Sequence, residues 1–382
     1  MIYRLVLKQV GTDDQMVLFC SHLGRNYSCN PKAIYEKMME EEKDRNYKIV
    51  WAFKKKDTQI PGNPKVVRYG SLKYLYHLSK AKYWVFNAKM PYQFPKKKNQ
   101  IYLQTWHGTP LKRLARDIES KSERFYRSQI SKDEMTKSYV LDARRYDYMI
   151  SPNAFSTEAF QSAFGLKREV LVETGYPRND VLVNTSSEEI ERIKEKHGIP
   201  QDKKILLYAP TWRDNHYDTT GYLFRLEVDF KKWKKTLGDD YFVIYKPHYL
   251  IYNTSNNSLD PDFGLDASSF EDINDLYLVS DILVTDYSSV FFDYGVLKRP
   301  MLFYMYDLED YRDNLRGFYL DIYTELPGPI VTEEDALLEE IKKAGEDPEY
   351  RQKQIERFYE KYCSLSDGRS SEKIIELVFN DA

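Results

Sequence analysis

The sequence predicts an α/β fold made of two halves, each with a parallel sheet covered by helices. Three observations lead to this prediction. Short apolar runs alternate with longer amphipathic segments, the alternation restarts in the second half of the chain, and polar clusters follow several of the runs. Short runs rich in β-branched and aromatic residues are typical of strands. Strands that alternate with helices form parallel sheets with helices on both faces.

In the first half, each predicted strand is bounded by Gly, Pro or Asn. The strands cover residues 16–20, 47–53, 65–69, 83–87, 101–106 and 146–153. Segments 31–43 and 71–81 have helical spacing. Pro31 suits a first helical turn, and Ser71 is a candidate N-cap. The charged segment 120–141 is either a helical excursion over a cleft, a membrane-facing patch or a solvated helix.

The second half repeats the pattern. Strands are predicted at 203–212, 241–249, 281–289 and 300–307, and helices at 188–199, 348–363 and 371–381. Gly198 suits the residue after a helix end, and segment 253–258 is expected to be a loop. We therefore expect one domain at 1–190 and a second at 191–365. The last helix, at 366–382, is expected to pack back on the first domain.

Composition limits the class of protein. The chain has 382 residues, 42% hydrophobic and 30% charged, which is typical of a globular protein of two or three domains. A net charge of -2 gives no global basic field for nucleic acid. The 33 tyrosines have three interpretations: stacking on sugars or nucleotides, contact with a membrane interface, or the amino-acid bias of an AT-rich genome. The sequence does not decide between them.

Other features indicate where the protein works. The three cysteines have no metal-ligand spacing and fit a reducing cytoplasm. No apolar run reaches the length of about 18 residues that a bilayer span requires. The N-terminal apolar stretch is too short for a secretory signal. We therefore expect the protein to work inside the cell.

Four polar clusters follow predicted strands and a fifth follows the apolar run "EVLV" (169–172); the carboxyl ends of strands in a parallel sheet form ligand sites. They are "QTWHGTP" (104–110), "ETGYPRND" (173–180), "APTWRD" (209–214), "KPHY" (246–249) and "TDYSS" (285–289). Chance explains any one cluster, but five in register predict a site.

The last cluster suggests a phosphate site. Ser288 and Ser289 precede a predicted helix, where free backbone N–H groups and the helix dipole favour an anion. A plain serine N-cap is the alternative. Arg213, Lys246 and His248 would add positive charge and directional donors for a diphosphate. We find no P-loop, no dinucleotide fingerprint and no acidic metal cage, so we expect protein groups to neutralise the phosphates and no metal to be required.

His107 has two interpretations. An imidazole accepts a proton near neutral pH and could deprotonate an attacking hydroxyl. Alternatively, it is a structural histidine that bridges loop carbonyls. Gly108 and Pro110 favour a loop shaped to present the ring. Asp117 is a candidate to orient or tune this base. His22, near Gly24, could border the same cleft.

Several motifs resemble one known family along nearly the whole chain. "QTWHGTPLK", "SPNAFST", "ETGYPRND", "YAPTWRD" and "DLYLVSDILVTDYSSVFFDYGVLKRP" are similar to the CDP-glycerol glycerophosphotransferases of wall teichoic acid synthesis. "YKPHY" departs from the pattern, because many glycerol phosphate polymerases have Arg-Met before this histidine. That departure leaves the acceptor and polymer length open.

The resemblance implies a GT-B-like architecture, with two Rossmann-like domains facing across a cleft. It implies transfer of glycerol phosphate from CDP-glycerol to a hydroxyl of an undecaprenyl-diphosphate-linked acceptor, with CMP leaving. It also implies peripheral attachment to the cytoplasmic face of an anionic membrane. Independently of the resemblance, the basic and aromatic residues of segments 89–98 and 120–141 make them candidate contacts, and solvent-exposed loops explain both segments equally well. No cofactor beyond the donor is expected.

The resemblance also assigns roles. His107 is the implied base, and His248 lies near the donor diphosphate. The implied substrate contacts are Gly108, Thr109, Arg178, Asn179, Thr211, Arg213, Lys246, Asp286, Ser288 and Ser289. Three alternatives remain: a CDP-ribitol-dependent transferase or a capsule enzyme, a nucleotide-sugar glycosyltransferase, and a scaffold without catalysis.

Overall fold

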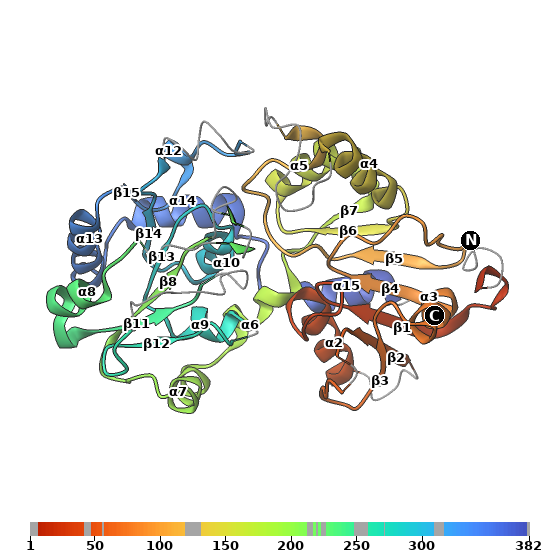
Figure 1. The fold of residues 1–382 in the computed structure, drawn as a ribbon, viewed down its shortest axis with the longest axis horizontal. Coiled ribbons are helices and arrows are strands. Elements are labelled where there is room, and N and C mark those ends of the chain that lie inside the picture. The colour runs from red at the N-terminus through yellow and green to blue at the C-terminus, as the bar shows by residue number, and fades with distance from the viewer. Residues whose placement is uncertain are drawn as a thin grey trace.

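The protein folds into two α/β halves that lie side by side (Figure 1). The computed structural model describes residues 7–41, 47–55, 57–118, 131–211, 217–218, 221–222, 227–247, 259–270, 272–308 and 317–379. Arg213, His248 and the predicted loop 253–258 lie outside these ranges. Among the described residues, no helix combines the length and apolar character needed to cross a bilayer.

The N-terminal half contains a seven-stranded sheet in the order β3-β2-β1-β4-β5-β6-β7, and all its pairs are parallel. Its strands are β1 (Asp13–Cys20), β2 (Lys48–Phe53), β3 (Lys65–Arg68), β4 (Ala81–Phe86), β5 (Ile101–Gln104), β6 (Tyr148–Ser151) and β7 (Leu171–Glu173). Inner strands such as β1 and β4 are buried along their C-terminal parts. The sheet is therefore covered on both faces, as parallel sheets require.

The helices of this half cap their ends with side chains that the sequence supplies. They are α2 (Cys29–Glu41), α3 (Leu72–Lys80), α4 (Lys132–Ala143) and α5 (Ala154–Phe164). Ser71 accepts a hydrogen bond from the backbone N–H of Tyr74 and caps α3. Ser131 and Glu134 form a capping box at α4, inside the predicted excursion. Residues 119–130 of that excursion lie outside the described ranges.

The C-terminal half contains a six-stranded parallel sheet in the order β12-β11-β8-β13-β14-β15. Its strands are β8 (Lys204–Ala209), β11 (Tyr241–Tyr245), β12 (Gly264–Asp266), β13 (Ile282–Thr285), β14 (Met301–Tyr304) and β15 (Ile330–Val331). A separate antiparallel pair is formed by β9 (Tyr217–Asp218) and β10 (Gly221–Tyr222). Its helices are α6 (Asp180–Asn184), α7 (Ser187–Lys196), α8 (Phe230–Leu237), α9 (Asn274–Val279), α10 (Val290–Tyr294), α12 (Ile322–Glu325), α13 (Glu334–Glu346) and α14 (Gln352–Tyr362).

The chain crosses between the halves twice. The first crossing runs through the 3₁₀ turn η4 (Pro177–Asn179) and α6, and Leu182 of α6 already packs in the core of the C-terminal half. The expected boundary at 190/191 falls inside α7. The second crossing follows α14 and ends in α15 (Ser370–Phe379), which lies beside the strands of the N-terminal half (Figure 1).

The helix α15 is part of the N-terminal core. Ile374, Ile375, Val378 and Phe379 are buried in the same cluster as β1, β2 and β4. The Tyr47 hydroxyl donates to the Phe379 carbonyl at 2.7 Å, 332 positions away in sequence. The two halves are thus joined by two stretches of backbone as well as by side-chain contacts.

Candidate functional site

A cavity of about 420 Å³, here called the interdomain cavity, lies between the two halves. The carboxyl ends of β8 and β11 and the start of α10 line it from the C-terminal half, and the loop after β1 lines it from the other half. Its charged and polar lining includes His22, Arg25, Asn26, Ser28, Lys246 and Ser288. Parallel strands direct their carboxyl ends to one edge of the sheet, and ligands of open α/β sheets bind beyond that edge. The interdomain cavity lies at this edge of the C-terminal sheet.

The loop after β5, residues 105–110, here called the base loop, is held in one conformation. Trp106 has a φ of +52°, which is unusual for a bulky residue and marks a constrained backbone. Its indole packs against Phe160 and Phe164, and it stacks on His107 with 4.6 Å between ring centroids. The Asn30 amide donates to the carbonyls of Thr105 and Trp106. His107 is therefore presented by a fixed frame.

The contacts of the His107 ring define its tautomer. Nδ1 lies 2.6 Å from the backbone carbonyl oxygen of Asn87. A carbonyl only accepts hydrogen bonds, so Nδ1 carries the proton and, in the neutral ring, Nε2 keeps a lone pair. This is the arrangement that a general base needs.

The pKa of His107 is shifted in the direction that keeps the ring neutral. The pKa is lowered to about 3, mainly because the surrounding protein desolvates the ring. The neighbouring His22 and Arg178 also lower it, whereas the hydrogen bond to the Asn87 carbonyl raises it. Part of the side chain is exposed, which weakens the desolvation. The direction of this shift favours the neutral ring at pH 7.

Asn87, at the end of β4, contacts both histidines of the site. Its carbonyl accepts from His107, and its side-chain Oδ1 accepts from the backbone N–H of His22 at 2.7 Å. Its amide also donates to Ser21. Asn87 is fully buried and was not among the predicted site residues. The one available signal was a polar residue at the end of an apolar strand.

His22 lies beside the predicted base. The two imidazole rings are 5.8 Å apart in an edge-to-face arrangement, and His22 lines the interdomain cavity. Burial lowers the pKa of His22 to about 4, and Arg178 and Arg25 add to this shift. His22, Leu23 and Gly24 all have positive φ, so the loop turns sharply here. His22 and Arg25 both line the interdomain cavity.

The "YPRN" segment after β7 holds the base loop. The Tyr176 hydroxyl donates to the carbonyl of Gly108 at 2.9 Å, and one guanidinium nitrogen of Arg178 donates to the carbonyl of His107 at 2.6 Å. The other nitrogen binds both carboxylate oxygens of Asp293 on α10, at 2.9 and 2.7 Å. Asn179 also donates to Asp293. Arg178 and Asn179, predicted as substrate contacts, bind protein groups here.

The base loop meets the predicted phosphate site across the boundary between the halves. A Cβ atom placed on Gly108 would lie 3.1 Å from Oγ of Ser289, so only a residue without a side chain fits easily. Thr109 is buried next to it. Ser288 accepts from the backbone N–H of Val290 at 3.4 Å and lines the interdomain cavity. The structure thus brings His107, Gly108, Ser288 and Ser289 into one region.

Two other predicted contacts support the frame of the C-terminal half. The buried carboxylate of Asp286 accepts from both the N–H and the hydroxyl of Thr211, which ties the end of β13 to the end of β8. Lys246 lines the cavity, and its ammonium donates to the carbonyl of Phe270 at 2.7 Å. Desolvation lowers the pKa of Lys246, and Asp266 opposes this effect.

Asp117 occupies a different place from the one we expected. Its carboxylate accepts from the hydroxyl of Ser162 at 2.7 Å and from that of Tyr319 at 2.6 Å. Tyr319 belongs to the C-terminal half, so Asp117 joins the halves. The residue that orients the His107 ring is Asn87, through its carbonyl. The expectation that Asp117 orients this base is therefore wrong in this structure.

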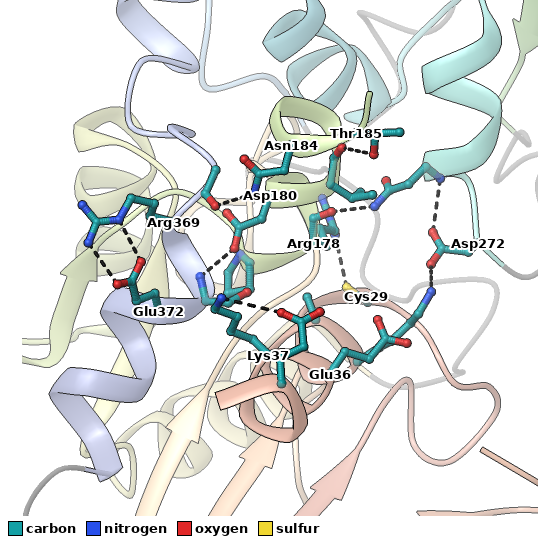
Figure 2. Close-up of a pocket in the computed structure, with 18 of the residues that line it drawn as sticks. Cys29, Glu36, Lys37, Arg178, Asp180, Asn184, Thr185, Asp272, Arg369 and Glu372 are labelled. Carbon is teal, nitrogen blue, oxygen red and sulfur yellow. Dashed lines mark hydrogen bonds and ion pairs between the residues drawn. The ribbon is translucent and has the colours of Figure 1, made fainter. Parts of the chain in front are cut away.

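A second cavity, here called the hinge cavity, has a volume of about 550 Å³ and lies along α2, η4, α6 and the start of α15. Figure 2 shows that its polar side chains bind one another. Lys32 pairs with Asp272 at 2.8 Å, and Arg369 pairs with Glu372 at the same distance. Asp180 accepts from the N–H groups of Ser370 and Ser371. The Asp180 contacts tie the two crossings together.

Comparison with known proteins identifies the family. One family model, described as CDP-Glycerol:Poly(glycerophosphate) glycerophosphotransferase, matches residues 1–380. The chain belongs to this family. The glycerophosphotransferase membership predicted from the motifs is confirmed, and the same region carries the base loop, the "YPRN" segment and the serines before α10.

Curated relatives agree with this. The teichoic acid poly(glycerol phosphate) polymerase of Bacillus spizizenii is 43% identical over 98% of this chain and 95% of its own length. The teichoic acid glycerol-phosphate transferase of Staphylococcus aureus is 42% identical over 95% of this chain and 92% of its own length. The chain spans only 52% of a Staphylococcus epidermidis polymerase that is 42% identical. Relatives named for ribitol phosphate share 28–30% identity.

Solved structures confirm the fold. The wall teichoic acid polymerase TagF is 42% identical, with a TM-score of 0.91 over 100% of this chain and 92% of that chain. A UDP-N-acetylglucosamine 2-epimerase, only 13% identical, still has a TM-score of 0.55 over 97% of this chain and 96% of its own. The predicted GT-B-like architecture is therefore confirmed.

Proposed function

We propose that this glycerophosphotransferase transfers glycerol phosphate from CDP-glycerol to a hydroxyl of a lipid-linked teichoic acid precursor and releases CMP. The main support is the His107 ring, whose Nδ1 donates to Asn87 and whose Nε2 is left as an acceptor. It lies beside His22 of the interdomain cavity. The family and its glycerol-phosphate relatives, at 42–45% identity, support the donor.

The chemistry follows from this arrangement. Nε2 of His107 takes the proton of the acceptor hydroxyl, and the acceptor oxygen attacks the phosphorus that carries glycerol. The bond from that phosphorus to the bridging oxygen breaks, and CMP leaves with the electron pair. A positioned base contributes roughly 10²–10⁴ in rate. The proton then passes from the imidazolium to solvent.

Donor groups at the other side of the cavity would stabilise the departing phosphate. Lys246 and Ser288 line the cavity, and Ser289 adjoins Gly108. Arg213 and His248, which lie outside the described residues, are proposed to add charge here. Fixed donors in a partly dry site stabilise developing charge strongly. The proposal includes no metal ion, so chelation with EDTA is expected to leave turnover unchanged.

The proposed membrane contact has two candidate segments, 89–98 and 120–141. Lysines of segment 89–98 are used within the protein: Lys96 pairs with Asp147 at 2.9 Å, and Lys97 donates to backbone carbonyls. We therefore assign the contact to segment 120–141. Sedimentation with anionic vesicles at low and high salt tests this, and no binding at low salt contradicts it.

Turnover of the full chain with CDP-glycerol and a defined lipid-linked disaccharide tests the function. We expect CMP release and a product heavier by one or more glycerol phosphate units, measured by mass spectrometry. CDP-ribitol and UDP-sugars serve as parallel donors, and preference for either contradicts the proposal.

Substitution of His107 tests the base. His107→Ala is expected to lower kcat by roughly 10²–10⁴. His77→Gln is the matched control, because His77 is a buried imidazole on α3 and is not among the residues that line the interdomain cavity. Unchanged kcat in His107→Ala would remove the base from the proposal.

A further inference from the structure

We propose that Arg178 is a positioning residue that couples the base loop of one half to α10 of the other half. It would thereby set the distance and direction between the base and the departing phosphate. The kinetic part of this inference rests on the proposed transferase function. Its structural part rests only on contacts of the described residues.

Arg178 is placed to control the base loop directly. Its guanidinium donates to the backbone carbonyl of His107 at 2.6 Å, and Tyr176 donates to the next carbonyl, that of Gly108. Its own backbone N–H donates to Asn30, whose amide in turn holds the carbonyls of Thr105 and Trp106. Four successive carbonyls of the base loop are thus bound by one connected group of side chains.

The same side chain holds the other half. Both oxygens of Asp293 accept from Arg178, and the two side chains are only 12% and 8% exposed. Asp293 lies on α10, four residues after Ser289. Asn274 of the C-terminal half donates to the Arg178 carbonyl at 2.6 Å. Arg178 therefore bonds at the same time to the base residue and to the helix that follows the phosphate site.

The geometry requires an arginine. One terminal nitrogen binds the His107 carbonyl and lies 3.2 Å from Sγ of Cys29, while the other binds the carboxylate. A planar guanidinium holds both directions at once, whereas the single ammonium of lysine does not. The ring of Tyr176 lies 4.9 Å from the guanidinium carbon and supports its orientation.

Arg178 is a poor candidate for a direct substrate contact. It lines the hinge cavity (Figure 2), whereas His22, Lys246 and Ser288 line the interdomain cavity. Both of its terminal nitrogens bind protein groups. In-line displacement requires alignment of groups that sit on separate halves, and a shift of about 1 Å can cost 10²-fold in rate. Loss of Arg178 should therefore reduce kcat more than it raises the donor KM.

The kinetic experiment compares Arg178→Lys, Arg178→Ala and Asp293→Asn in the full chain. We expect each to lower kcat about 100-fold, with the KM for CDP-glycerol within about threefold of the parent. Arg168→Ala is the matched control, because Arg168 forms an ion pair of 2.9 Å with Glu173 on the surface; its kcat should be unchanged. Unchanged kcat in Arg178→Ala, or a loss confined to the donor KM, overturns the proposal.

Two further variants separate positioning from general damage to the fold. Free guanidinium, at a concentration too low to unfold the protein, should restore at least tenfold of the kcat lost in Arg178→Ala. The double variant Arg178→Ala with Asp293→Asn should lose about as much kcat as the more damaging of the two single variants, because both substitutions remove one link. Absence of rescue together with additive losses overturns the coupling.

A readout without turnover keeps this test independent of the proposed function. The chain has six histidines, so ¹⁵N spectra of labelled imidazoles are tractable, and His107→Ala assigns the His107 signals. The parent should show one Nδ1–H tautomer, and Arg178→Ala a mixture of both. If the parent does not turn over CDP-glycerol, the function fails but the tautomer still decides the positioning role. An unchanged tautomer in Arg178→Ala overturns it.

Discussion

Asn87 contacts the two histidines of the site with different parts of one residue. The side chain holds the backbone of His22, and the backbone carbonyl holds the ring of His107. A backbone carbonyl has no signature in the sequence, because every residue carries one. The sequence therefore indicates the histidine and offers Asp117 as a candidate to orient or tune it, but nothing in the sequence indicates the Asn87 carbonyl.

The lowered pKa of His107 predicts the pH dependence of turnover. In the proposed mechanism the neutral ring is the active form, and it persists down to the folded-state pKa, which is lowered from 6.5 to about 3. We expect kcat/KM to stay flat from pH 8 to about pH 5 and to fall only at lower pH. Circular dichroism at each pH checks that the protein stays folded. An acid limb with a midpoint at or above pH 6.5 would contradict the tautomer and the shift.

At the scale of elements, short apolar runs rich in β-branched and aromatic residues predicted most strands of the two large sheets. Each predicted strand has a counterpart, such as β1 at Asp13–Cys20 and β13 at Ile282–Thr285. The short edge strands β12 and β15 were missed, because three or two residues carry no periodic pattern. The link between Arg178 and Asp293 was missed as well. It joins positions 115 apart, and only packing of the two halves brings them together.

The helix α15 gives a prediction about stability. Ile374 is fully buried in the N-terminal core, whereas Leu377 on the same helix is 46% exposed. Ile374→Ala should lower the free energy of unfolding of this half by about 2–5 kcal/mol. Leu377→Ala should change it by less than about 0.5 kcal/mol. Urea unfolding followed by tryptophan fluorescence measures both, and equal effects would mean that α15 is not part of this core.

At the scale of the whole molecule, buried histidines make stability depend on pH. His77 is 4% exposed, and desolvation, with Lys65 and Lys80, lowers its pKa from 6.5 to about 4. Between these values the unfolded chain binds a proton that the folded chain does not. Stability is therefore complete above pH 6.5 and falls as the pH drops toward 4.

This effect has a measurable size. From pH 7 to pH 5, His77 should contribute a loss of about 2 kcal/mol in the free energy of unfolding. Urea unfolding at both pH values measures the total loss, to which other histidines contribute. His77→Gln should reduce that loss by about the His77 share. A variant with the same pH dependence as the parent would show that His77 titrates normally in the folded protein.

The return of the chain into its first half also limits how the molecule can move. Two backbone passages, one through η4 and α6 and one after α14, connect the halves, and we expect them to restrict the relative motion of the halves to rotation about one axis. Swinging about that axis changes the width of the gap at the base loop, while twisting about any other direction would stretch one of the passages. Substrate entry and product exit are then expected to depend on one motion, a hinge rotation that separates the two halves at the base loop.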